Sequence, residues 1–247
     1  MRGLLKLTWL EIRIFVREPL GVISAIGIPL IMFLVLGRSV SPGAAPSARA
    51  TQFLAQDVPL FVSIFISINA ALSLIAVISI YREGGILRRL RATPLRPAVI
   101  LGAHVLVKLF FTGIALLLTV LAGRRFYPVT LHAHVAGFGL AVVVTTVTIL
   151  CMGFVIASAV GTARFAQVIG SAIFYPMLAI SGMFVPLGSL PRPWALLGGA
   201  LPMSHAVALL RAAWVGAGWP VLLPHLGVLA VTTAICLGLT TRVFRWE

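Results

Sequence analysis

Acidic residues are scarce in this chain of 247 residues, which has five Asp and Glu against 19 Lys and Arg. Lysine is rare too, since Lys6 and Lys108 are its only occurrences. Neither lysine follows a glycine-rich loop, so the sequence has no P-loop to bind nucleotide phosphates. Scattered carboxylates cannot hold a Mg²⁺–nucleotide complex. We therefore expect no ATP hydrolysis by this chain alone, no catalytic residue and no bound cofactor.

Residues that bind metals are also few. Cys151 and Cys236 each lie in an apolar segment, without a nearby His or second Cys. A buried cysteine of this kind usually packs as a small hydrophobic residue. His132 and His134 are two positions apart in a polar segment, but a third ligand is missing. The sequence therefore predicts no metal site.

Apolar residues dominate what is present. The chain is 60% hydrophobic and 10% charged, with a mean hydropathy of +1.12. The apolar runs are continuous and do not alternate with polar residues, which favours helices over a barrel. The basic residues that give the chain its net charge of +14 lie between the apolar segments. They do not form a stripe with interleaved aromatic residues, so we do not expect nucleic-acid binding. The fold class is predicted to be an all-α, polytopic membrane protein.

The predicted architecture is a single transmembrane domain over residues 1–247 with six spans. An amphipathic helix within residues 1–18 suits the membrane interface, and Pro29 is expected to kink the first span. Residues 161–165 are expected to form a turn between the fourth and fifth spans. The predicted spans are residues 20–37, 58–80, 99–123, 135–160, 166–185 and 221–239.

Residues 186–219 are apolar in places but do not suit a further span. A span here would place Arg211 in lipid and would have to contain Pro202. We therefore predict two short helices that enter the membrane and return. Six spans place both termini on one side. That side has about twice as many Lys and Arg residues as the other, which predicts cytoplasmic termini.

The segment 81–97, YREGGILRRLRATPLRP, is a charged island between two apolar spans. Charges are costly in a bilayer, so the island must lie in water. After two glycines, apolar residues recur at helical spacing opposite several arginines, which predicts a short amphipathic helix. Such a helix needs a surface to cover its apolar side. The residues alone leave two interpretations: contact with a bilayer edge or partner protein, or a basic loop that only sets topology.

Four polar residues within spans are candidates for a translocation path: Asn69, His104, Lys108 and Gln167. Interhelical hydrogen bonding is the alternative for Asn69 and Gln167. His104 and Lys108 are four apart and share a helix face. Their alternative interpretation is a position near the interface, where the lysine extends to water.

Four segments of the chain resemble the permease subunits of type 2 ATP-binding-cassette (ABC) exporters. WLEIRIFVREP (9–19) resembles the connecting helix of that family, and YREGGILRRLRATPL (81–95) its cytoplasmic loop with the coupling helix. SGMFVPLGSLP (181–191) resembles the end of the fifth span. LPMSHAVALLR (201–211) resembles the re-entrant segment before the last span.

This resemblance implies partners and a cellular location. Cytosolic P-loop ATPase subunits would bind ATP and Mg²⁺. A second permease copy, expected to be the same chain, would complete the path. The expected location is the inner membrane of a bacterium or archaeon. The expected cargo is a hydrophobic drug, an antibiotic or a lipid-like molecule. The alternatives are a polysaccharide or glycolipid exporter, and a lipid-binding scaffold that transports nothing. The residues expected to contact the ATPase are Arg82, Glu83, Gly84, Arg88, Leu90 and Arg91.

Overall fold

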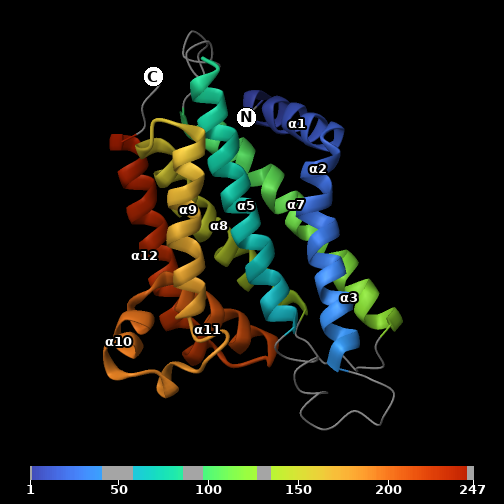
Figure 1. The fold of residues 1–247 in the computed structure, drawn as a ribbon, viewed down its shortest axis with the longest axis vertical. Coiled ribbons are helices and arrows are strands. Elements are labelled where there is room, and N and C mark those ends of the chain that lie inside the picture. Colours follow the sequence, from blue (N-terminus) through green and yellow to red (C-terminus); the bar gives the residue numbers. More distant parts are fainter. Residues whose placement is uncertain (1, 41–57, 86–96, 127–134, 244–247) are drawn as a thin grey trace.

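The computed structural model describes residues 2–40, 58–85, 97–126 and 135–243 (Figure 1). Within these ranges all regular elements are helices, and no strand occurs. The prediction of an all-α protein is therefore confirmed. The helices are α1 (Arg2–Arg17), α2 (Pro19–Val22), the π-helical turn η1 (Ile23–Gly27), α3 (Ile28–Val40), α5 (Val58–Glu83), α7 (Pro97–Phe126), α8 (Val135–Ala159), α9 (Ala163–Ala179), the 3₁₀ turn η3 (Leu187–Ser189), α10 (Arg192–Ala200), α11 (Pro202–Trp214) and α12 (Trp219–Val243).

Four of the described helices, α5, α7, α8 and α12, are long and apolar enough to cross a membrane. The number of candidate spans rises to six if two bent helix pairs each count as one span. The chain is therefore a multi-pass membrane protein. Helix α9 has 17 residues and runs alongside α5 through the bundle (Figure 1). It begins at Ala163 and ends at Ala179, so the predicted turn is present at its start but is shorter than residues 161–165, and the predicted span at 166–185 was placed too late.

The first bent pair joins α1 to the segment α2–η1–α3 at 95°. Pro19 begins the second helix of the pair, a position where its missing N–H costs no hydrogen bond. The predicted separation of an amphipathic helix from the first span is thus confirmed. The irregularity near Pro29 is a π-helical turn over Ile23–Gly27, in which the Ile28 N–H bonds to the Ile23 carbonyl. The helix widens just before the proline, which cannot donate to the preceding turn.

The core of the bundle lies where α5 packs against α8. A Cβ atom at Gly153 of α8 would lie 3.3 Å from the carbonyl oxygen of Ala71 on α5, so a small residue allows the two backbones to approach. One helical turn further along α5, a Cβ at Gly170 of α9 would lie 2.7 Å from Ile75. Helix α5 therefore packs closely against both α8 and α9.

The second bent pair consists of α10 and α11, which meet at 77°. This confirms that residues 186–219 contain two short helices, whereas their entry into the membrane and return stays a prediction. Helix α11 is largely buried, and its Trp214 meets Phe138 of α8 edge-on with ring centres 4.7 Å apart. Neighbouring helices thus cover most of α11. Helices α10 and α11 lie at the end of the bundle opposite α1 (Figure 1).

Candidate functional site

The last turn of α5 carries the part of the charged island that the structure describes. Helix α5 ends at Glu83, and Gly85 follows with φ of 66°, a left-handed conformation that glycine adopts without strain. The Gly84 N–H still bonds to the Ile80 carbonyl at 2.8 Å, which closes the helix. Arg88, Leu90 and Arg91 lie outside the described residues. Of the six residues predicted to contact the ATPase, the structure therefore describes Arg82, Glu83 and Gly84.

Arg82 is bonded to the C-terminal end of α8. Its guanidinium donates to the carbonyl oxygens of Ala157 and Ser158, the latter at 3.2 Å. The last carbonyls of a helix lack partners within the helix and carry partial negative charge. Arg82, on the neighbouring helix α5, gives these carbonyls both a hydrogen-bond donor and a positive charge.

Glu83 is bonded to the N-terminal end of α9. Its carboxylate oxygen Oε1 accepts a hydrogen bond of 2.7 Å from the backbone N–H of Ala163, the first residue of that helix. Free N–H groups and partial positive charge make a helix N-terminus favourable for a carboxylate. Arg82 and Glu83 thus hold the two helix ends that flank one turn. We call these two residues and their partners the α8–α9 bracket.

Glu11 of α1 is the centre of a buried polar cluster with Tyr81 and His104. The Tyr81 hydroxyl donates to Glu11 Oε1 at 2.9 Å, and His104 Nδ1 lies 3.9 Å from Glu11 Oε2. Only 8% of Glu11 is exposed. This cluster joins α1 to α5 and α7. The sequence gives no signal for this role of Glu11, because its partners are remote in the chain.

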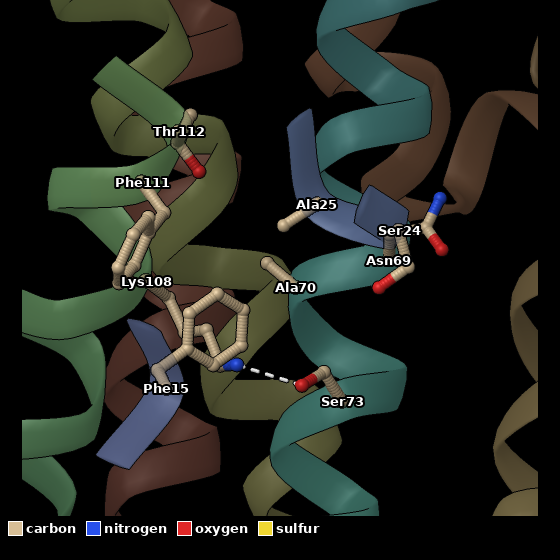
Figure 2. A pocket seen from close by; sticks show the side chains of 9 residues that line it. All are labelled: Phe15, Ser24, Ala25, Asn69, Ala70, Ser73, Lys108, Phe111 and Thr112. Atoms are coloured by element: carbon tan, nitrogen blue, oxygen red, sulfur yellow. Dashed lines mark hydrogen bonds between the residues drawn. The ribbon is translucent and has the colours of Figure 1, made fainter. Parts of the chain in front are cut away.

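Lys108 of α7 is buried as well, with 6% of the residue exposed. Its Nζ donates to Ser73 Oγ of α5 at 2.6 Å and lies 4.5 Å from the centre of the Phe15 ring of α1 (Figure 2). A cation above an aromatic face is stabilised by the ring quadrupole. The amino group of Lys108 thus points across the bundle to α5 and not to water, while the alternative position of this turn near the interface stays a prediction.

A small pocket lies beside this lysine (Figure 2). Its volume is about 30 Å³, which is room for one or two water molecules. Asn69 and Lys108 both line it, so the structure brings these two predicted path residues together. His104 lies one helical turn from Lys108 in the Glu11 cluster, whereas Gln167 is exposed on α9. The lining residues are Phe15, Ser24, Ala25, Asn69, Ala70, Ser73, Lys108, Phe111 and Thr112.

The family model described as "ABC-2 type transporter" matches residues 2–215. The match begins in α1 and includes every described helix up to the end of α11. No curated protein matches the chain.

Proposed function

The chain belongs to the ABC-2 type transporter family, and we propose that it is the permease subunit of an ATP-driven exporter. Membership of this family of membrane permeases implies a transport role. The observation that supports energy coupling is the position of the α8–α9 bracket. It lies in the last turn of α5, directly before the basic segment 86–96.

The proposed contact with the ATPase is the island that follows the bracket. Arg88 and Arg91 can pair with acidic groups of a partner, and Leu90 can fill an apolar pocket between them. Arg82 and Glu83 have partners within the chain, so their role in our proposal is transmission. A displacement of the island would pull on both ends of the α8–α9 turn.

The remaining partners and the orientation follow from the same proposal. Cytosolic ATPase subunits would hold ATP and Mg²⁺, and a second permease copy, with the same chain as the first candidate, would complete the path. Helix α1, the C-terminal end of α5 and the C-terminal end of α12 lie at one end of the bundle (Figure 1). We propose that this end faces the cytoplasm of a bacterium or archaeon, in keeping with its excess of Arg and Lys.

The proposed cargo is a hydrophobic drug, an antibiotic or a lipid-like molecule. The spans are almost wholly apolar, which suits such a molecule better than a long sugar chain. The pocket beside Asn69 and Lys108 is too small for any of these cargoes, so transport would require α1, α5 and α7 to separate. Gln167 would reach the path only through a second chain or a rearrangement, because it lies on the outside of α9.

Co-purification tests the proposed partnership. The chain is expressed with the P-loop ATPase encoded beside it, and the complex is captured in mild detergent. The double variant Arg88→Glu, Arg91→Glu should lose the ATPase, because charge reversal turns attraction into repulsion. The matched control is Arg124→Glu, Arg125→Glu, which reverses two charges at the other end of α7 and should retain it. Failure of the wild-type chain to retain the ATPase would contradict the exporter proposal and favour the lipid-binding scaffold.

A second variant separates transmission from contact. Glu83→Gln keeps the size of the side chain but weakens its bond to the Ala163 N–H, since the charge is lost. We expect this variant to retain the ATPase while cargo no longer stimulates ATP hydrolysis. Loss of the ATPase itself would show that Glu83 belongs to the contact surface and that the transmission role is wrong.

A further inference from the structure

We propose that His205 and His225 form a binding site for a divalent transition-metal ion that joins α11 to α12. The two histidines are 20 positions apart in the sequence, yet their Nδ1 atoms are 3.0 Å apart. Their ring centres are 5.2 Å apart and the planes are inclined by 51°. The site lies at the end of the bundle opposite α1 and is independent of the transport role proposed above.

The protonation of His205 is determined by its second contact. Its Nε2 lies 3.1 Å from the carbonyl oxygen of Gly199, the residue before the last in α10. A carbonyl can only accept, so Nε2 must carry the hydrogen. In neutral His205 the lone pair of Nδ1 is then directed at His225. A histidine that donates one ring N–H to a backbone carbonyl is the usual form of a metal ligand, because this bond orients the ring.

The distance between the two Nδ1 atoms fits a shared metal ion. Two nitrogens bound to one ion at about 2.0–2.1 Å, with an angle of about 90–110° between the bonds, lie about 2.9–3.4 Å apart. The observed 3.0 Å falls within this range. If His225 also carries its hydrogen on Nε2, two lone pairs face each other and a cation must lie between them. The competing arrangement is a direct hydrogen bond from Nδ1–H of His225 to His205.

The ligand set indicates the class of metal. Two imidazoles favour Zn²⁺, Ni²⁺ or Cu²⁺ over Mg²⁺ and Ca²⁺, which prefer oxygen ligands. Within the described residues no group of three or more His, Cys, Asp and Glu side chains lies together. In our proposal water completes the coordination, and both histidines are partly exposed to allow it. Such a site would tie the buried helix α11 to α12, whose surface is mostly exposed.

Metal-dependent stability is the test. The full chain is purified in detergent with a tag that contains no histidine, treated with a chelator, and then supplied with Zn²⁺ or Ni²⁺. Unfolding is followed with a thiol-reactive dye, because Cys151 and Cys236 are both buried in the folded protein. We expect the metal to raise the midpoint of wild-type unfolding by about 5 °C. The variant His225→Ala should lose this shift, while its His205 keeps the bond to Gly199.

Two further measurements keep the proposal testable if His225→Ala is unstable. The double variant His132→Ala, His134→Ala removes the two histidines that belong neither to the proposed site nor to the Glu11 cluster, and it should behave as wild type. Equilibrium dialysis should find one Ni²⁺ per wild-type chain, none on His225→Ala, and recovery in His225→Cys, because cysteine also binds these ions. Equal metal binding by wild type and His225→Ala, or none by wild type, would show that the pair is only a hydrogen bond.

Discussion

At the end of the bundle that carries α1, directional polar contacts join neighbouring helices, whereas α11 at the opposite end is held mainly by apolar packing. The first end has the Glu11 cluster, the Lys108–Ser73 bond and the α8–α9 bracket. At the second end, α11 buries a row of apolar side chains and Trp214 meets Phe138. Directional bonds hold two helices in one arrangement, so loss of one bond changes a specific contact. Apolar packing is non-directional and instead responds to volume.

The largest effect should follow loss of the carboxylate at the first end. Glu11→Ala removes the acceptor of the Tyr81 hydroxyl and the nearest acid to His104. We expect a loss of about 2–3 kcal/mol in the free energy of unfolding in detergent, because a buried hydrogen bond to a charged group disappears. The control Glu18→Ala changes an exposed acid one residue beyond α1 and should cost less than about 0.5 kcal/mol. Similar losses in both variants would contradict the polar description of this end.

The second largest loss of stability should follow from added volume at the second end. A Cβ atom at Gly198 would lie 2.6 Å from the carbonyl oxygen of Ile180 and 2.7 Å from Leu187, whereas one at Gly199 would meet nothing within 4 Å. Gly198→Ala must therefore displace α10 from its neighbours, at about 1–3 kcal/mol. Gly199→Ala should be neutral or slightly stabilising, because alanine favours a helix. Denaturant unfolding of the two variants compares them directly, and equal stabilities would show that this end tolerates added volume.

An intermediate and local effect should follow loss of the arginine in the α8–α9 bracket. Arg82→Met leaves the last carbonyls of α8 without their donor, which should cost about 1–2 kcal/mol. Hydrogen exchange should accelerate at the backbone amides of the α8–α9 turn and remain unchanged in α11. The control Arg164→Met removes an exposed arginine of α9 and should leave exchange at the turn unaltered. Acceleration throughout the bundle would argue that Arg82 supports global stability instead of one turn.

The smallest change in stability should come from the buried lysine. Lys108→Met replaces a desolvated charge with an apolar chain of similar length, and such replacements are often neutral or stabilising. We expect a change of less than about 1 kcal/mol, in contrast to Glu11→Ala. Stimulation of the partner ATPase by hydrophobic compounds should nevertheless change, since Lys108 lines the pocket with Asn69. A large loss of stability would mean that the Ser73 bond and the Phe15 contact are essential to the fold.

Much of the fold was predictable because hydropathy is a strong signal in a membrane protein. Backbone groups in lipid must bond within their own segment, so a long apolar run has to become a helix. The predicted start of α8 at residue 135 and the predicted start of α5 at residue 58 agree with the structure. The two short helices before α12 followed from Pro202 and Arg211, which a full span could not contain. The end of α9 was less predictable, because the apolar sequence continues beyond Ala179 into turns.

The candidate site was predictable only in part. Spacing placed His104 and Lys108 on one face of α7, but it could not show which helix they would meet. The partners of Arg82 and Glu83 are backbone groups, which carry no signal in the sequence. The role of Arg88, Leu90 and Arg91 stays a prediction, because these residues lie outside the described ranges.

The class, the helical segments and the basic island between two spans follow from the order of the amino acids, because each depends on the cost of burying charge and backbone in lipid. The packing of the helices is what brings Glu11 to Tyr81, Lys108 to Ser73 and His205 to His225. Each of these pairs joins residues that lie on different helices and are far apart in the sequence. Their contact depends on which helices become neighbours and how each is rotated, and hydropathy does not encode either property.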